Sequence, residues 1–361
     1  VMICEAGVTL AEAQAAALAA DRLFPLSLAA EGTCTVGGNV ATNAGGVTVI
    51  AYGNMRDLVT GVEAVLADGR IVNALSKLRK DNTGYDVKSL FVGSEGTLGI
   101  VTAASLKLFP NPRAGATAFV GLESPDKALE LLRLMRDRLG AGVTSFELIA
   151  AMAYDMTVKH GLARAPLSGA HAWYVLTEAS SQIAQGFEEG FTQALEAALE
   201  SGIVEDAAIA ASLDQRHEFW RLRESIPEAQ VREGGSIKHD VSVAVGDVPK
   251  FIEEATRAVH AFEPGARVVA FGHLGDGNIH FNVSQPGGVD KAKFLARWDA
   301  MNAVVHAIVA RKGGSFSAEH GVGRLKRELL ARTKDPATLA LMRKIKATLD
   351  PNGVMNPGKI L

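Results

Sequence analysis

The most constraining feature of the chain is an uncharged, glycine-rich run near its beginning. The run Gly32–Gly46 reads GTCTVGGNVATNAGG and carries five glycines in fifteen residues. Glycine has no Cβ atom, so such a run lets backbone N–H groups approach other backbone or a ligand closely. It matches neither the G-x-G-x-x-G dinucleotide fingerprint nor the G-x-x-x-x-G-K-[ST] phosphate loop. The run therefore indicates either tight turns between strands or a surface for a diphosphate or a heterocycle.

The uncharged stretch continues to Met55, which makes it longer than the ~20 residues of a membrane span. Hydrocarbon would not accept its many Gly, Thr and Asn residues, so we expect buried loop and strand and no membrane span. The N-terminus carries no basic-then-apolar signal pattern. The chain opens with VMICEAG, which is typical of a strand, and we interpret it as missing an upstream segment.

Size, charge and cysteine content narrow the class of protein. A chain of 361 residues exceeds the ~100–200 residues of one domain, so two domains are expected. The 37 Lys and Arg residues against 40 Asp and Glu give a net charge of −3, which disfavours a dedicated nucleic-acid binder. Cys4 and Cys34 form no C-x-x-C pair, which excludes a disulfide scaffold and a cysteine zinc site. A reducing, cytoplasmic location is expected.

The pattern of secondary structure changes at Pro110 and Pro112. Before them, a T-x-x-E capping box at Thr9 predicts a helix that ends near Asp21. Asp68-Gly69 predicts the turn between two strands. A second glycine motif in this part, GSEGTLG at Gly93–Gly99, contains an acidic residue and has the same two interpretations as the first.

From residue 114 onward, strands alternate with amphipathic helices. The first of these helices is predicted between an N-cap at Ser124 and a C-terminal glycine at Gly140. We expect an α+β fold in which an antiparallel sheet has helices stacked on one face. Further strands are expected near 171–178, 203–209, 237–245, 267–273 and 279–284. Further helices are expected near 182–200, 213–233, 248–262 and 290–312.

Two histidines in the segment VVAFGHLGDGNIHFNV favour a metal site. The Asp276-Gly277 pair is a preferred two-residue hairpin turn, and a turn centred there places His273 directly opposite His280. Their Cβ atoms would then be ~5 Å apart on one face of the hairpin, close enough for both imidazoles to bind one cation. Asn282 would point to the same side. The alternative is that both histidines are hydrogen-bonded residues of the core or its rim.

Two histidines need a third ligand, and the segment SFSAEHGVGR offers a carboxylate. Two imidazoles and one acid are a known ligand set of catalytic zinc centres. Glu319 and His320 are adjacent, so in extended chain they point to opposite sides. One can then bind a metal while the other addresses a substrate. The alternative is a solvated Glu-His pair in a turn.

Cations suited to a carboxylate ligand occur in RLRESIPEA and SIKHDVSV. Arg223 lies four residues before Pro227, which should end or kink the helix. Alternation places Lys238 and Asp240 on one face of a strand. Judged alone, Arg221 and Arg223 read as a solvated helix surface and Lys238 with Asp240 as a local ion pair.

The order of these motifs resembles the FAD-dependent D-2-hydroxy-acid dehydrogenases of the vanillyl-alcohol-oxidase type. The motifs that carry the resemblance are GTCTVGGNVATNAGG, YGNMRDLVTGVEAVLADGRIV, NTGYDVKSLFVGSEGTLGIVT, GHLGDGNIH and EHG. The resemblance covers essentially the whole chain except an upstream subdomain that grips the FAD diphosphate. It implies the second part of an FAD-binding domain at 1–112, a substrate (cap) domain with a metal site at 113–335, and a C-terminal helix and tail returning to the FAD domain at 336–361.

The resemblance also assigns residues to cofactors. It implies FAD contacts from the following residues of the two glycine motifs and the tail: Thr33, Gly37, Gly38, Asn39, Thr42, Gly45, Gly46, Glu95, Gly96, Gly99, Ile100 and Asn356. It implies a divalent metal, zinc first and Mn²⁺, Co²⁺ or Fe²⁺ as alternatives, on His273, His280 and Glu319.

For the substrate, the resemblance implies a D-2-hydroxy acid such as D-lactate or D-2-hydroxyglutarate. Arg223 and Lys238 match the residues that hold its carboxylate, while Asn282 and His320 match further substrate contacts, with His320 as general base. Pro227 stands where the hydroxyglutarate enzymes have a polar, threonine-type side chain. The expected reaction is hydride transfer to flavin N5, giving a 2-oxo acid.

Partners and rival functions remain open at this point. The reduced flavin would need an acceptor such as a quinone, a cytochrome or an electron-transfer flavoprotein, and a homodimer is one option for the assembly. A flavin-free metallohydrolase would use the same two histidines and glutamate to activate water, but it has no use for the glycine motifs. A non-catalytic subunit of a flavoprotein complex is the third interpretation.

Overall fold

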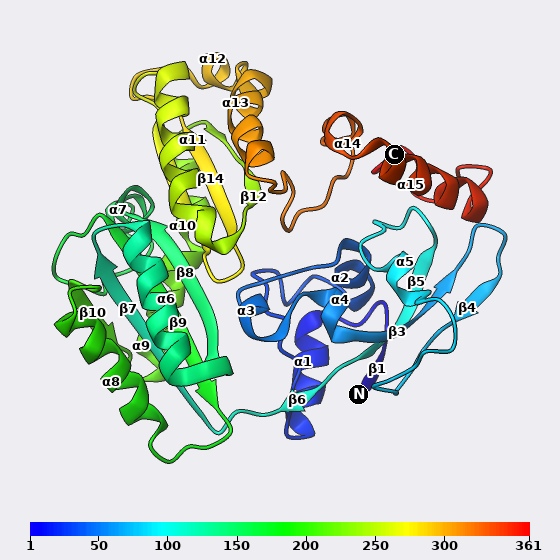
Figure 1. Ribbon diagram of the computed structural model, residues 1–361, viewed down its shortest axis with the longest axis horizontal. Coiled ribbons are helices and arrows are strands. Elements are labelled where there is room, and N and C mark those ends of the chain that lie inside the picture. Colours follow the sequence, from blue (N-terminus) through cyan, green and yellow to red (C-terminus); the bar gives the residue numbers. More distant parts are fainter. The chain divides into compact units, whose positions relative to one another are not determined.

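The computed structural model describes residues 1–361 and divides them into two compact units (Figure 1). Unit 1 combines Val1–Asn111 with Glu319–Leu361, and unit 2 is Pro112–Ala318. The first division falls beside the predicted domain boundary after residue 112. The second falls between Ala318 and Glu319, before the predicted boundary after residue 335.

Unit 1 is built on a four-stranded antiparallel sheet with the strand order β1-β5-β3-β4. The strands are β1 (Met2–Glu5), β3 (Val59–Val65), β4 (Ile71–Asn73) and β5 (Ile100–Leu106), with a separate pair β2 (Arg22–Leu23) and β6 (Phe109–Pro110). The helices are α1 (Leu10–Ala19), α2 (Val36–Thr42), α3 (Val49–Tyr52), α4 (Met55–Leu58), α5 (Lys88–Phe91), α14 (Arg327–Thr333) and α15 (Pro336–Leu349).

Local sequence signals explain much of unit 1. Thr9 caps α1 and forms the predicted capping box with Glu12, and this helix ends at Ala19. The turn at Asp68-Gly69 joins β3 and β4 as predicted, with Gly69 at a φ of +83°. The expectation of loop and strand in the uncharged stretch was wrong, because residues 36–42 of the glycine-rich run form α2 and Val49–Tyr52 form α3. Helix α2 buries Val36 and Val40 in the core of the unit.

Unit 2 contains an antiparallel sheet of eight strands. The order along the sheet is β10-β7-β9-β8-β13-β14-β11, and β12 also pairs with β14. The strands are β7 (Ala114–Leu122), β8 (Val143–Ala150), β9 (Trp173–Ser181), β10 (Asp206–Ile209), β11 (Ser236–Ile237), β12 (Asp240–Ser242), β13 (Arg267–His273) and β14 (Asn278–Ser284). The helices are α6 (Pro125–Leu139), α7 (Ala151–Lys159), α8 (Phe187–Glu200), α9 (Leu213–Glu224), α10 (Ile226–Arg232), α11 (Val248–Phe262), α12 (Lys291–Leu295) and α13 (Trp298–Arg311).

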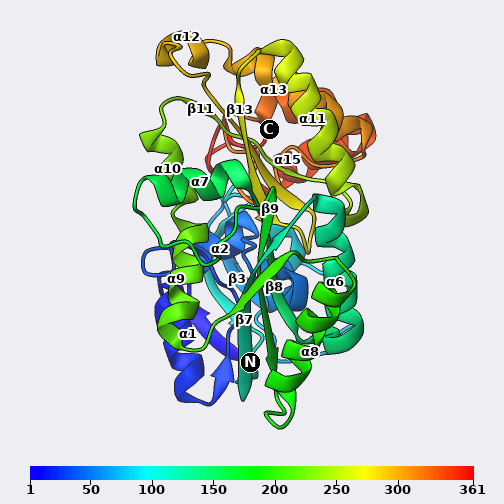
Figure 2. The ribbon, with the colours of Figure 1, turned by 90° about the vertical axis from the view of Figure 1, so that its left-hand side faces the viewer.

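Helices cover both faces of this sheet, so the expectation of helices on one face was wrong. Neighbouring residues of a strand point to opposite faces, and Phe119 and Val120 of β7 are both fully buried. Phe119 packs against Tyr154 of α7 and Phe219 of α9. On the other face, Thr177 of β9 contacts Met135 of α6. Figure 2 shows α7 and α9 on one side of the strands and α6 and α8 on the other.

The hairpin of β13 and β14 differs from the prediction in its turn. Four residues, 274–277, separate the strands, and the observed pairing places Phe271, not His273, opposite His280. The Asp-Gly pair lies at the end of this turn and not at its centre. The shift is two residues, and because side chains alternate with a period of two, both histidines still point to the same face.

No helix of the chain combines the length and apolar character that a membrane crossing requires.

Candidate metal and substrate site

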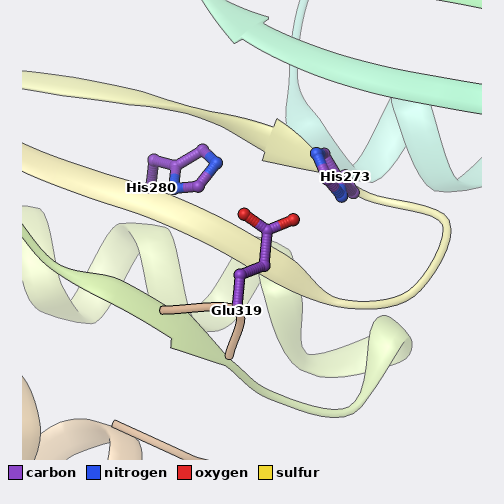
Figure 3. Close-up of side chains that lie close together, drawn as sticks. All are labelled: His273, His280 and Glu319. Carbon is purple, nitrogen blue, oxygen red and sulfur yellow. The ribbon is translucent and has the colours of Figure 1, made fainter. Parts of the chain in front are cut away.

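Three side chains that the sequence singled out lie together. The ligand atoms of His273, His280 and Glu319 are all within 4.8 Å of one another. Figure 3 shows the carboxylate of Glu319 directed toward the two imidazoles, which come from the end of β13 and from β14. The centroids of the two imidazole rings lie 6.0 Å apart, and the ring planes are inclined at 89° to one another. Bonds of ~2.1 Å around a tetrahedral ion would place the ligand atoms ~3.4 Å apart. Side-chain movements of about an ångström would therefore bring all three ligand atoms to coordination distance of one ion.

The backbone of unit 2 accounts for the position of Glu319. Ser315 exchanges two backbone hydrogen bonds with Ser242 of β12, at 2.8 and 2.9 Å. Three residues later, the N–H of Ala318 donates to the carbonyl of Asp240, which pairs with His280 across β12 and β14. Glu319 follows Ala318 directly. The segment therefore runs along the edge strand and delivers the carboxylate next to His280.

Further carboxylates surround the two imidazoles. Asp240 Oδ1 lies 3.9 Å from His280 Nδ1, and Asp276 Oδ2 lies 3.7 Å from His273 Nδ1. Asp240 also accepts a hydrogen bond from the side chain of Asn278 at 3.0 Å. Carboxylates next to metal-binding histidines commonly orient the rings and raise their basicity. Two imidazoles and a carboxylate among acidic neighbours fit a divalent cation.

Arg223 is buried, so the interpretation of a solvated helix surface was wrong for this residue. Only 8% of it is exposed, and its Nε donates to Glu147 Oε2 at 2.6 Å. Arg221, two residues earlier, is exposed and pairs with Glu218 on the same helix, as the solvated interpretation predicted. Helix α9 ends at Glu224 and α10 begins at Ile226 with Pro227 in its first turn, which confirms the predicted interruption.

The other predicted substrate contacts have different surroundings. Lys238 is exposed in the connection between β11 and β12, and His320 is exposed directly after Glu319. Asn282 is 4% exposed; its Nδ2 donates to Gln230 at 2.9 Å, and its Oδ1 accepts from the backbone of His239 at 3.2 Å. The amide of Asn282 thus ties β14 to α10 and to the chain before β12.

The residues expected to contact FAD divide into two groups. Several glycines are required by the chain itself: a Cβ on Gly37 would lie 2.5 Å from Ala6, on Gly46 1.8 Å from the carbonyl of Ser27, and on Gly99 2.9 Å from the carbonyl of Val65. Close packing therefore requires glycine at these three positions, although none of them lies in a tight turn between two strands, and Gly37 lies within α2. Gly45 is half-buried beside Val49.

The other residues expected to contact FAD are exposed to solvent or carry polar side chains. Thr33, Gly38 and Thr42 are exposed, and a Cβ on Gly38 would meet only the hydroxyl of Thr35. Asn39 is 5% exposed beside them in α2, and Ile100 is exposed at the start of β5. The exposed residues Thr33, Gly38 and Thr42 of the glycine-rich run would allow a ligand to contact the backbone closely.

Glu95 and Asn356 connect the second glycine motif to the C-terminal segment of unit 1. The side chain of Asn356 donates to the carbonyl of Glu95 at 2.5 Å. A Cβ on Gly96 would have Asn356 as its nearest neighbour, at 3.8 Å. The tail therefore returns to the 93–99 motif.

Comparisons with known proteins identify the family of the chain. Residues 111–360 match the family described as FAD linked oxidases, C-terminal domain, and residues 1–75 match the family described as FAD binding domain. The chain belongs to the FAD-linked oxidases.

The relatives of this FAD-linked oxidase chain have consistent names. It is 40% identical over 366 residues to the mitochondrial D-2-hydroxyglutarate dehydrogenase of Rattus norvegicus, a match that covers 100% of this chain and 66% of the relative. It is 39% identical over 357 residues to the D-2-hydroxyglutarate dehydrogenase of Xanthomonas citri pv. viticola, covering 99% of this chain and 74% of the relative. The chain thus spans about two thirds to three quarters of these relatives.

Solved structures confirm the fold of the FAD-linked oxidase. The chain superposes on p-cresol methylhydroxylase with a TM-score of 0.74 at 18% identity, covering 99% of this chain and 75% of that protein. This likeness confirms the expected α+β fold of the vanillyl-alcohol-oxidase type. The sequence interpretation missed one acidic residue of the site, Glu147, although a single charge in the apolar strand VTSFELIA signals a buried partner.

Proposed function

We propose that this chain takes part in the FAD-linked oxidation of a D-2-hydroxy acid, such as D-2-hydroxyglutarate or D-lactate, to the 2-oxo acid. The observation that carries the proposal is the convergence of His273, His280 and Glu319 in a member of the FAD-linked oxidases. The names of the relatives favour D-2-hydroxyglutarate as the substrate.

The residues present fit a divalent metal. In the proposal, His273, His280 and Glu319 hold it, and zinc is the first candidate, with Mn²⁺, Co²⁺ and Fe²⁺ as alternatives. When bound, such an ion supplies Lewis acidity that lowers the pKa of a substrate hydroxyl.

Side chains of this protein bind and orient the substrate. Arg223 and Lys238 supply positive charge for the carboxylate, and a guanidinium can hold a carboxylate through two parallel hydrogen bonds. His320 follows a metal ligand directly and is exposed, so it is the general base that accepts the hydroxyl proton. Asn282 holds the strand that carries His280 in position through Gln230.

The two electrons leave the substrate with the hydrogen on C2. FAD, when bound, supplies the acceptor for that hydride at flavin N5. Thr33, Gly38, Asn39 and Thr42 are the residues whose exposure or position in α2 best fits contact with it. Reoxidation of the flavin needs an acceptor of the quinone, cytochrome or electron-transfer flavoprotein class. We also propose a cytoplasmic location for this chain, which would differ from that of the mitochondrial relative in Rattus norvegicus.

One preparation tests the proposal. The full-length protein is isolated with its flavin and mixed anaerobically with D- and L-enantiomers of lactate, malate and 2-hydroxyglutarate, and metal content is measured on the same sample. Bleaching of the flavin absorbance by a D-enantiomer, with about one metal per chain, is the expected result. A colourless metalloprotein with hydrolase activity, or a colourless and inert protein, would replace the proposal by the metallohydrolase or the non-catalytic subunit.

A further inference from the structure

A buried carboxylate lies between the residues proposed to bind metal and substrate. Glu147 is in the middle of β8, and its side chain has no exposed surface. A charged carboxylate is costly to bury unless it is paired and hydrogen-bonded. The role of Glu147 therefore follows from the partners of its two carboxylate oxygens.

One oxygen of Glu147 holds Arg223. The Nε of Arg223 donates to Oε2 at 2.6 Å, and the guanidinium carbon lies 4.8 Å above the centre of the Phe271 ring. A charge-assisted hydrogen bond and an aromatic face fix the guanidinium in one orientation. Arg223 is thus positioned from two sides by strands of the sheet.

The other oxygen of Glu147 faces His273. The two residues are direct partners across β8 and β13, so their side chains share a face of the sheet. Oε1 is buried without a hydrogen bond and lies 3.8 Å from Nε2 of His273. A histidine that binds a metal through one ring nitrogen usually donates the N–H of the other to a carboxylate or carbonyl.

We propose that Glu147 is a positioning residue that orients a metal-binding imidazole with one oxygen and a substrate-binding guanidinium with the other. This inference rests on the proposed function, and it adds a coupling between two parts of the site. A small rotation of His273 brings its ring N–H to Oε1, so ion binding and the orientation of Arg223 share one carboxylate.

The same sheet contains a matched control. Glu178 of β9 lies on the face that carries Glu147, because Ser145 of β8 pairs with Glu178 and Leu176 pairs with Glu147. Arg216, two turns before Arg223 in α9, binds Glu178 at 2.5 and 3.0 Å. This second pair also ties α9 to the sheet, but it includes no residue of the proposed site. Glu178→Gln therefore controls for the loss of an ion pair between α9 and the sheet.

Metal affinity distinguishes a positioning role from a structural one. The metal-stripped protein with its flavin is titrated with Zn²⁺ against a chromophoric chelator, and Co²⁺ absorption reports the coordination geometry. For Glu147→Gln we expect Zn²⁺ affinity about 10- to 100-fold weaker than in the wild type, an altered Co²⁺ spectrum, and a higher KM for the D-2-hydroxy acid. For Glu178→Gln we expect Zn²⁺ affinity within about twofold of the wild type.

The outcomes separate this inference from the proposed function. If the wild type binds Zn²⁺ and the affinity of Glu147→Gln stays within about twofold of it, the positioning role is overturned while the metal site stands. If the wild type itself binds no Zn²⁺, the metal site fails first. Should Glu147→Gln not fold, Glu147→Gln with Arg223→Met removes both charges together, and the same loss of Zn²⁺ affinity is expected from it.

Discussion

The carboxylate of Glu95 accepts a hydrogen bond from the backbone N–H of Val322 at 2.6 Å. Its second oxygen accepts from the N–H of Gly323 at 2.8 Å, so two nearby backbone donors of the C-terminal segment share one carboxylate. Gly321 has a φ of +70°, and a Cβ there would lie 2.5 Å from Glu95 Oε1. A residue expected to contact FAD therefore also anchors the loop that follows Glu319 and His320.

The anchoring predicts a glycine requirement at position 321. Gly321→Ala should lower the free energy of unfolding by about 1–3 kcal/mol, because the methyl group displaces Glu95 and the backbone conformation is unfavourable for alanine. Gly353→Ala is the control: Gly353 has a φ of +65° but nothing within 4 Å of its Cβ position. Faster amide hydrogen exchange across 319–326 in Gly321→Ala alone checks the prediction, and equal exchange in both variants contradicts it.

His280→Ala should abolish metal binding and activity while the fold persists. The side chain is 14% exposed, and its loss removes one of three ligands. Metal content by elemental analysis and the melting temperature are the measurements. His217→Ala, which changes an exposed residue of α9, should keep the metal. Full metal content in His280→Ala would refute the assignment of this ligand.

Arg223→Ala should destabilise unit 2 strongly. It leaves the carboxylate of Glu147 buried without its charged partner, which typically costs about 3–5 kcal/mol. Glu147→Gln removes that charge, so the double variant should be more stable than Arg223→Ala alone. A double-mutant cycle by urea denaturation measures the coupling, and strictly additive effects would show that the two residues do not stabilise each other.

Stability should fall in acid partly through Glu233. Hydrogen bonds from Lys159 and then Arg267 lower the pKa of this nearly buried carboxyl from 4.5 to about 2. Because the folded pKa is depressed, its contribution is present above pH ~4.5 and is lost as the pH falls toward 2. The difference corresponds to about 3 kcal/mol. Urea denaturation between pH 6 and pH 2 should therefore show a weaker pH dependence for Glu233→Gln than for the wild type.

Pro227 gives a prediction about substrate choice. It is exposed at the start of α10, four residues after Arg223, at a position where the family resemblance implies a polar, threonine-type side chain in hydroxyglutarate enzymes. Pro227→Thr should raise kcat/KM for D-2-hydroxyglutarate relative to D-lactate by about tenfold, the effect of one added hydrogen bond. Pro227→Ala controls for the loss of the ring. An unchanged ratio in Pro227→Thr would separate this residue from substrate selection.

Sequence patterns predicted the elements that have clear ends. The expected ranges 248–262 and 267–273 are those of α11 and β13, and Ser124, Pro125 and Gly140 delimit α6 as predicted. β8 and α7 were missed because VTSFELIA is buried on both faces and shows no alternation. The helix follows at once, without a side-chain cap to mark its start.

The site was predictable only where residues share a periodic element. His273 and His280 lie on one hairpin, so a register error of two residues preserved their common face. Local patterns predict a solvated Arg223, because its buried partner Glu147 lies on a strand distant in sequence. Pairings of that kind depend on the order of strands in the sheet, which local patterns do not specify.

Unit 1 is assembled from two stretches separated by the whole of unit 2. During synthesis, the first stretch leaves the ribosome long before the amides of Val322 and Gly323 exist to receive the Glu95 carboxylate. We expect residues 1–111 to remain incompletely folded until residues 319–361 have been synthesised. A chain truncated after residue 318 should accordingly be sensitive to protease within residues 1–111 while residues 112–318 resist digestion.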